Sequence, residues 1–249
     1  GVDGTGSFTQ SGGTNSVSHN LYLGTHSVLG NGDGSGTYTI SGGTLGVGGD
    51  IVGGSSIGNF NTSTLNIDGG TVNAGTIGVE TLNIGNSAGT NGSHTLGSGE
   101  SITADIETIG NSGTGSFTQS DGTHTVLNFS LGVNDGGSGT YDLSGGTHTV
   151  DGLNLAVNTG SSGTYTISGG NLSTNNSYVG GSSAGSGGSG TLNISVNGDA
   201  LISSALKIWD SGIVNLSGGT LKAGTIDNAN GGSFNFTGGT LAVDTFTGA

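Results

Sequence analysis

A short segment that returns along the chain limits the possible folds more than any other feature. GTYTISGG occupies residues 36–43 and again residues 163–170, and GTYDLSGGT occupies residues 139–147. Tyr38 and Ile40 are two residues apart, so they share one face of a strand, and the glycine pair after them allows a tight corner. A strand this short cannot bury its apolar face alone, which is why repeats of this kind stack on one another.

Ten copies of this unit align along the sequence. Their first core positions are Phe8, Tyr38, Leu65, His94, Phe117, Tyr141, Tyr165, Leu192, Val214 and Phe234. The pattern predicts an all-β fold, namely a single right-handed-type parallel β-solenoid domain over residues 1–249. We expect about ten coils of three short strands, with variable corner loops, in a rod of roughly 45 to 50 Å.

Each copy contains three expected strands. The first carries pairs such as Tyr38 and Ile40, Phe117 and Gln119, and Phe234 and Phe236. The second follows the glycine pair, with Leu45 and Val47, Val72 and Ala74, Leu221 and Ala223, and Leu241 and Val243. The third precedes the loop, with Leu21 and Leu23, Leu82 and Ile84, Phe129 and Leu131, Leu153 and Leu155, and Leu206 and Ile208. Insertions at residues 30–35, 86–92 and 180–190 are rich in glycine, asparagine and serine, which is typical of corner loops.

Composition excludes two other glycine-rich classes. Glycine provides 58 of 249 residues and proline is absent, so a collagen helix is excluded. Apolar residues recur at period two between the glycine pairs, a pattern that a solvated disordered linker does not need.

The charge balance also excludes classes of partner. Two cations, Lys207 and Lys222, stand against 16 acidic residues, and the formal net charge is -14. Nucleic acids and anionic membrane surfaces need clustered basic residues, so neither is an expected partner. No apolar run approaches the roughly 20 residues of a membrane span.

The residue types that are missing suggest an extracellular location. Cysteine and methionine are absent, and two lysines without arginine leave few sites for trypsin-like proteases. Such a composition suits exposure to oxidants and proteases. We therefore expect a secreted or cell-surface protein; the chain shows no signal segment and reads as a processed form or a fragment.

The repeat also resembles a known class. Residues 5–14, TGSFTQSGGT, and residues 36–45, GTYTISGGTL, are similar to the glycine-rich repeats of bacterial autotransporter passengers and of secreted proteins with PEP-type sorting signals. This resemblance implies a bacterial β-solenoid that is secreted or displayed on the surface. The sequence contains neither the membrane barrel nor the sorting tail of those proteins.

His124 and His148 are the sharpest candidate pair for chemistry. Each lies in a GTHTV context, 24 residues apart, so we expect them to stack on adjacent rungs and, by alignment with Leu45, to face inward. A structural zinc site needs four ligands and the sequence shows no third, so a packed ladder is the preferred interpretation and no metal site is predicted. His19, His26 and His94 have no evident partner.

Cofactor and enzyme chemistry find little support in the sequence. The loops at residues 31–34 and 134–136 could offer oxygens to calcium, but asparagine-glycine and aspartate-glycine pairs are also common turn formers, so no cofactor is predicted and calcium stays open. Glu80, Glu100 and Glu107 form no recognisable pair of catalytic carboxylates. We therefore expect no enzymatic activity.

Two surface features remain. Trp209, beside Lys207, is expected to point outward and could contact a glycan or another surface ligand. Outward threonines such as Thr37 and Thr39 could order water in an ice-binding array, but threonine is also an ordinary residue of solvated strands.

The ends of the repeat array suggest a function. The sequence enters a repeat close to Val2 and Phe8, and its last copy carries Phe234, Phe236 and Phe246, with no polar cap at either end. Uncapped coils expose strand edges and core residues, so we expect head-to-tail stacking of copies into an extracellular fibre or matrix. The alternative is a cell-surface adhesin or binding stalk whose loops contact glycan or host ligands.

Overall fold

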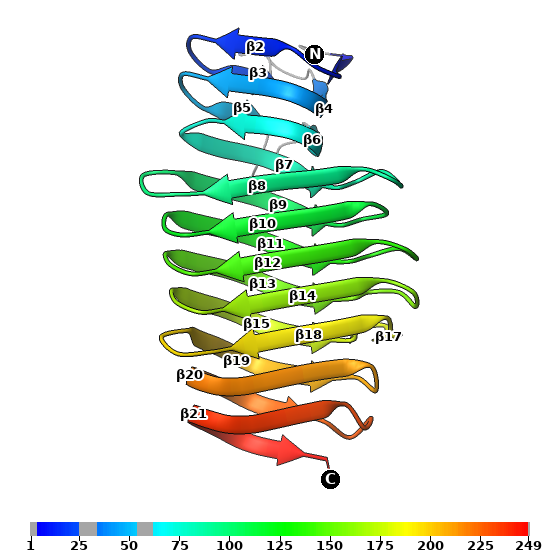
Figure 1. Cartoon of the computed structure of the whole chain (residues 1–249), viewed down its shortest axis with the longest axis vertical. Helices are drawn as coiled ribbons and strands as arrows, with labels where there is room; N and C mark the ends of the chain where they lie inside the picture. The colour runs from blue at the N-terminus through cyan, green and yellow to red at the C-terminus, as the bar shows by residue number, and fades with distance from the viewer. Residues whose placement is uncertain (1–3, 25–33, 54–61, 249) are drawn as a thin grey trace.

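The computed structural model describes residues 4–24, 34–53 and 62–248. These residues form a stack of parallel strands, which Figure 1 shows as a tall coil running from the N-terminus at one end to the C-terminus at the other. No described residue is helical, so no helix in this part of the chain could cross a membrane. The all-β parallel solenoid expected from the sequence is confirmed.

Twenty-one strands are described. They are β1 Thr5–Gln10, β2 Thr14–Val17, β3 Leu21–Leu23, β4 Ser35–Val47, β5 Ile51–Gly53, β6 Ser63–Asn73, β7 Thr76–Ile84, β8 Asn91–Leu96, β9 Ser101–Ile109, β10 Thr114–Gln119, β11 Thr123–Leu131, β12 Ser138–Leu143, β13 Thr147–Leu155, β14 Ser162–Ile167, β15 Asn171–Val179, β16 Gly181–Ser182, β17 Gly185–Ser186, β18 Ser189–Ile194, β19 Asp199–Ile208, β20 Gly212–Asp227 and β21 Ser233–Thr247. Most pair in parallel with the strand one turn away, while β16 and β17 form a small antiparallel pair.

Three ladders of inward side chains fill the coil. The first ladder is Phe8, Tyr38, Leu65, Leu82, Glu107, Phe129, Leu153, Ser177, Leu206, Ile226 and Phe246. The second ladder has two parts: Asn15, Leu45 and Val72, then His94, Phe117, Tyr141, Tyr165, Leu192, Val214 and Phe234. The third ladder is Leu21, Ile51, Ile77, Ile102, His124, His148, Leu172, Ala200, Leu221 and Leu241.

The two parts of the second ladder lie on the same side of the coil. Figure 1 shows β6 and β8 as successive rows on the front face, and residues around Val72 and His94 line one shallow hollow. In that view the front strands run leftward and the rear strands return rightward as the chain descends, which makes the coil right-handed.

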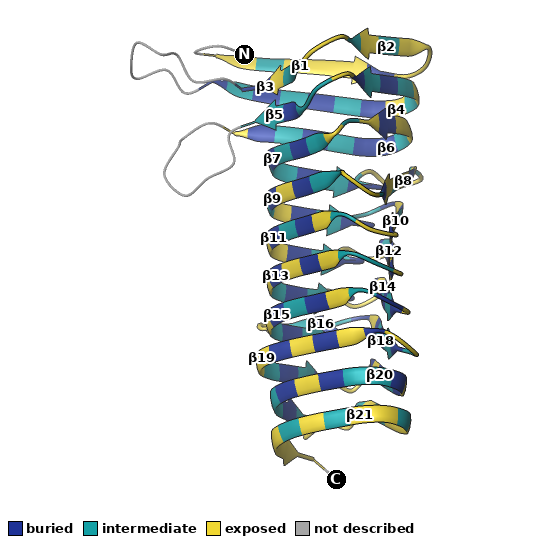
Figure 2. Cartoon of the chain, turned by 90° about the vertical axis from the view of Figure 1, so that its left-hand side faces the viewer, coloured by how far each residue is buried: buried dark blue, intermediate teal, exposed yellow. Residues whose placement is uncertain are grey.

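About eight regular turns run from Thr71 in β6 to Thr247 in β21, slightly fewer than the ten coils expected. Strands β1 to β6 extend the same ladders beyond those turns, toward the N-terminal end. Burial alternates along the middle strands, with a break at Asp151 and Gly152 in β13, and Figure 2 shows this as alternating dark and light bands. The core is therefore a column of stacked residues, because parallel pairing places each inward position over its equivalent in the next turn, and the register shifts within four strand pairs do not break the three ladders.

The register corrects two alignments made from the sequence. Leu65 does not stack beneath His94; it pairs with Leu82, only 17 residues later. Leu221 does not share a ladder with Leu45 either, because it belongs to the third ladder together with Leu21. From β7 onward, the repeat unit therefore occupies different faces of the coil from those it occupies near the N-terminus.

Candidate functional site

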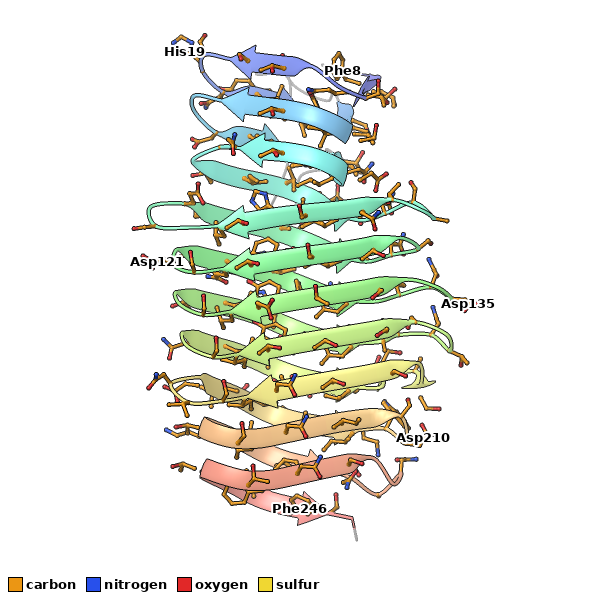
Figure 3. The ribbon with its side chains drawn as sticks, viewed as in Figure 1. Phe8, His19, Asp121, Asp135, Asp210 and Phe246 are labelled. Atoms are coloured by element: carbon orange, nitrogen blue, oxygen red, sulfur yellow. The ribbon has the colours of Figure 1, made fainter. Side chains whose placement is uncertain are left out.

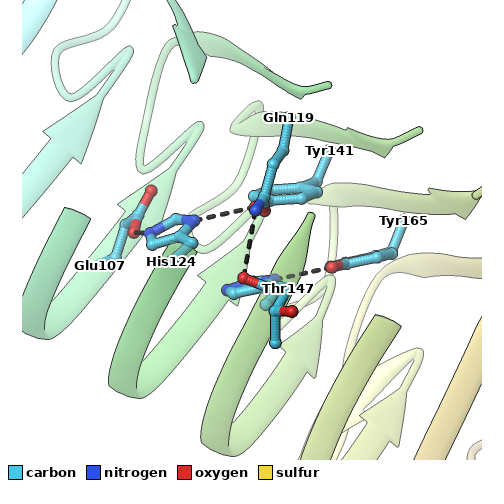
Figure 4. A network of polar contacts seen from close by, with 7 residues as sticks. Glu107, Gln119, His124, Tyr141, Thr147 and Tyr165 are labelled. Carbon is cyan, nitrogen blue, oxygen red and sulfur yellow. Dashed lines mark hydrogen bonds and ion pairs between the residues drawn. The ribbon is translucent and has the colours of Figure 1, made fainter. Parts of the chain in front are cut away.

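A polar cluster lies inside the apolar column, between β9 and β14. It contains Glu107 from the first ladder, Gln119 and Tyr141 on the second face, and His124 and His148 from the third ladder, together with Tyr165. All of these side chains are fully buried. Figure 4 shows them converging from four neighbouring turns.

Gln119 fixes the direction of the hydrogen bonds. Its amide nitrogen donates to the carbonyl oxygens of Gly122, at 3.2 Å, and Thr147, at 3.1 Å. Its amide oxygen then accepts the hydroxyl proton of Tyr141, at 2.5 Å. The side chain thus joins two strands across a corner, and its inward polar groups are satisfied as burial requires.

An identical heptapeptide builds the same unit near the N-terminus. TGSFTQS occupies residues 5–11 and residues 114–120. Gln10 donates to the carbonyl oxygens of Gly13 and Thr44 and accepts from Tyr38 at 2.5 Å, as Gln119 does with Tyr141. Asn15 stands where the second copy has His124, and its amide nitrogen donates to the Tyr38 hydroxyl oxygen at 3.0 Å.

The two histidines stack as the sequence predicted. His124 and His148 are directly opposite on β11 and β13, and their ring centroids are 4.4 Å apart. Each Nδ1 contacts a tyrosine hydroxyl, His124 with Tyr141 at 2.8 Å and His148 with Tyr165 at 2.6 Å. The alignment with Leu45 was wrong, since the histidines belong to the third ladder, but their inward orientation is confirmed.

Glu107 is the residue that the sequence did not identify. Its Oε2 lies 2.5 Å from Nε2 of His124, and both side chains are inaccessible to solvent. The sequence showed no carboxylate pair at Glu107, and the partner that the structure places beside it is a histidine. The missed signal is its position two residues before Ile109, an inward place that equivalent turns fill with Leu82 or Phe129.

The two histidine rungs differ in their surroundings. Where His124 meets Glu107, His148 meets the ring of Phe129, edge to face at 4.9 Å between centroids. Among the residues that the structure describes, neither Nε2 of His148 nor Oε1 of Glu107 has a hydrogen-bond partner. The two stacked imidazoles therefore have different neighbours, an aromatic ring beside His148 and a carboxylate beside His124.

Burial shifts the pKa values of two histidines and two tyrosines in and beside this cluster. The pKa of His148 is held well below its ordinary value, first by burial and then by the charge of His124. The same two causes lower the pKa of His94 to about 4, and its ring lies tilted against that of Phe117, with the centroids 5.4 Å apart. Burial, followed by nearby ionisable groups, raises the pKa of Tyr141 and Tyr165 well above 10. These four groups are therefore neutral at ordinary pH.

His94 thus has neighbours that its sequence context did not indicate. His19 contacts the hydroxyl of Ser18 at 3.0 Å, and His26 lies outside the described residues. No group of three or more potential metal ligands occurs within residues 4–24, 34–53 and 62–248. The loop at residues 31–34 lies mostly outside those ranges; in the loop at 134–136, Asn134 donates to Asn111 at 2.9 Å.

The predicted surface site at Trp209 is partly covered. The indole N–H donates to the carbonyl oxygen of Ser182 at 3.1 Å, which fastens the β16–β17 loop to the coil. Lys207 lies over the ring, with Nζ 4.8 Å from its centroid, and forms an ion pair with Asp227 at 2.7 Å. The hydrogen bond from Lys207 is the main cause of the lowered pKa of Asp227.

The predicted assembly residues lie at the two ends of the stack. Phe8 is in β1 and 53% exposed, while Phe236 and Phe246 are in β21 and are 51% and 44% exposed. Figure 3 shows Phe8 and Phe246 at opposite ends of the rod. Phe234 is half-buried beside Phe246, with ring centroids 5.7 Å apart, and Val2 lies outside the described residues.

Comparison with known proteins gives no relative: the chain matches no family model, no curated protein and no solved structure.

Proposed function

We propose that this protein is a non-catalytic structural subunit that stacks head to tail into an extracellular fibre or matrix. One observation carries the proposal: the two ends of the described coil expose the same three ladders in the same order. Two features support the proposal. Side chains of core positions are exposed at each end, and each exposed position at one end belongs to the same ladder as a position at the other end.

The C-terminal turn exposes residues that are buried in every middle turn. Phe236 and Phe246 are about half exposed, although the equivalent Leu216 and Ile226 one turn earlier are fully buried. Figure 2 shows the change as the light colour of β21 below the darker turns. The outer edge of β21 also offers backbone groups to a further parallel strand.

The N-terminal end is hollow where the C-terminal end presents aromatic rings. A cavity of about 320 Å³ opens there, lined by residues that include Phe8, Asn15, Leu21 and Tyr38. These residues come from all three faces, so the cavity is the open end of the core. A phenyl ring entering it would lose contact with water and gain aromatic neighbours.

Stacking of two copies continues every ladder without a change of face. Phe246 of one copy meets Phe8 of the next in the first ladder, and Phe234 meets Asn15 in the second. Leu241 meets Leu21 in the third ladder. Such a contact joins two different surfaces and does not close on itself, so it builds a filament.

The test is sedimentation and electron microscopy of the whole chain at increasing concentration. We expect fibres with an axial repeat of about 50 Å, the height of about ten strand rows. Replacing Phe236 and Phe246 together with aspartate should abolish the fibres, because a carboxylate would be buried without a partner. The matched control is Ile106→Asp, which is 44% exposed at mid-rod and should leave assembly unchanged. Monomers at high concentration, or fibres unaffected by the double substitution, would contradict the proposal.

A surface-displayed binding stalk is the second candidate. The observation that favours it is the β16–β17 loop, which projects from one turn and is fastened by Trp209 beside Lys207. Glycan-array binding that disappears when residues 180–190 are deleted, in a chain that forms no fibres, would favour this function over assembly.

A further inference from the structure

The polar cluster in the core has a proton count that can be determined from its hydrogen bonds. Gln119 donates both amide hydrogens to carbonyl oxygens, so its oxygen faces Tyr141 and must accept. The single hydroxyl proton of Tyr141 is used in that bond. Nδ1 of His124, 2.8 Å from the same hydroxyl oxygen, must therefore donate and carries a proton.

The N-terminal unit supports this direction independently. There Asn15 occupies the place of His124, and its amide nitrogen donates to the hydroxyl oxygen of Tyr38. Tyr38 in turn donates to Gln10, as Tyr141 does to Gln119. The same position thus supplies a donor in both copies of the heptapeptide unit, although one side chain is an amide and the other an imidazole.

A second proton must lie between His124 and Glu107. With a proton already on Nδ1, an unprotonated Nε2 facing an ionised carboxylate at 2.5 Å would bring two acceptors together. Either the imidazole holds this proton and Glu107 is ionised, or Glu107 holds it and the imidazole is neutral. In both arrangements the pair has no net charge, which the low polarity of the core requires.

The surroundings provide no other compensating charge. The titratable groups that face His124 from the packed strands are His94 on β8, Glu107 on β9, Tyr141 on β12, His148 on β13 and Tyr165 on β14. Both lysines of the chain are in later turns, on β19 and β20. A charge on the pair would therefore have no partner.

We propose that the Glu107–His124 contact is a proton-dependent lock of the central turns, which stabilises the fold less and less as the pH rises above the value at which free histidine loses its proton. This inference stands independently of the proposed fibre. Above about pH 6.5 the unfolded chain holds one proton on this histidine and none on this glutamate. The folded pair holds two, so folding takes up one proton and rising pH favours unfolding.

The expected size of the effect follows from that single proton. The unfolding equilibrium constant should rise about tenfold for each pH unit above roughly 6.5, as long as the folded pair keeps its second proton. Above about pH 7.5, His94 and His148 are neutral in both states, and Tyr141 and Tyr165 are protonated in both. The rise of the unfolding equilibrium constant with pH above neutrality is therefore due to Glu107 and His124.

The test is urea unfolding of the whole chain at pH 6.5, 7.5 and 8.5. In Glu107→Gln, the amide can donate to Nε2 of a neutral His124, so the hydrogen bonds persist without the extra proton and the pH dependence should vanish. His148→Gln is the matched control on the adjacent rung and should keep the full dependence. Equal slopes in the native chain and in Glu107→Gln would overturn the proposal.

A spectroscopic measurement covers the case in which a variant fails to fold. Nitrogen-15 spectra of the histidine rings in the native chain at pH 8.5 should show one histidine with a proton on Nδ1 and a shared or bound proton at Nε2. If every histidine shows an unprotonated Nδ1 at that pH, the lock does not exist.

Discussion

Most inward positions of this solenoid hold an apolar side chain, and a few in the central turns hold a polar one. Phe129 and Glu107 occupy adjacent places of the first ladder, and each has a histidine beside it. The edge of His148 packs on a ring, while His124 meets a carboxylate. The polar side chains of the cluster take hydrogen-bond partners from neighbouring turns, as Glu107 does from His124.

Removal of the Tyr141 hydroxyl tests this dependence. Tyr141→Phe leaves the Gln119 oxygen and Nδ1 of His124 without a partner in a buried site, so we expect a loss of about 1 to 3 kcal/mol in the free energy of unfolding. Tyr178→Phe is the control, because Tyr178 is half-buried on the outer surface of β15, and its effect should stay within about 0.5 kcal/mol. Urea unfolding at pH 6.5 measures both; equal effects would contradict the role of the hydroxyl.

The neutral histidines His94 and His148 determine how the stability of the fold should change as the pH falls. The pKa values of His94 and His148 are lowered in the folded chain, that of His94 to about 4. The stability that these two neutral histidines contribute to the fold is fully present above about pH 6.5. It is lost as the pH falls, because only the unfolded chain then gains protons on these histidines. Stability should decrease from pH 6.5 to 4.5, and less steeply in His148→Leu. An unchanged slope in that variant would show that His148 is not neutral in the fold.

At the scale of the elements, the corners are held by residues in the left-handed backbone region. Gly110 and Gly132 follow equivalent strands and have φ values of 73° and 66°. A Cβ on Gly110 would lie 2.0 Å from the carbonyl oxygen of Ser138, at the start of β12. Glycine is required there for conformation and for the close approach of stacked backbones.

Two glycine-to-alanine substitutions separate these causes. Gly136 has a φ of 76°, but no heavy atom of the described residues lies within 4 Å of the place that an alanine methyl group would take. Gly136→Ala should therefore cost only about 1 to 2 kcal/mol, for the strained backbone. Gly110→Ala adds a clash with backbone and should cost clearly more. Thermal unfolding of the two variants measures both losses of stability. Similar losses would mean that the stacked backbones at Gly110 move apart to fit a methyl group without a cost in stability.

The sequence was sufficient to predict strands, corners and inward positions, but not the face of the coil on which each unit falls. Period-two patterns identify which residues face inward, as at Tyr141 and Leu143, yet they are the same for any face. The short turn from Leu65 to Leu82 moves the repeat unit to the next face of the coil. No residue type marks one corner of a turn from the other two, so the sequence does not show this shift. Glu107 was missed for a related reason: its partner is 17 residues away, a distance that has meaning only once the turn length is known.

For the whole molecule, the net charge of -14 opposes the stacking of copies. The two lysines cannot neutralise the acidic residues of a neighbouring copy, so repulsion between rods should limit assembly at low ionic strength. Salt screens this repulsion, with a screening length that falls from about 30 Å at 0.01 M to about 8 Å at 0.15 M. The concentration at which fibres appear in sedimentation should therefore decrease as sodium chloride is raised over that range. Fibres that dissolve with added salt would point to an ionic contact instead.

The shift of face between the two TGSFTQS segments places the same strand motif on two sides of the rod. Phe8 belongs to the first ladder and Phe117 to the second, so the outward Ser7 and Thr9 point in a different direction from Ser116 and Thr118. A molecule that recognises this strip would find it twice on one rod, at two heights and on two sides. Each rod could then bridge two such molecules that are not aligned with one another, which is the geometry of a branched network and not of a parallel bundle.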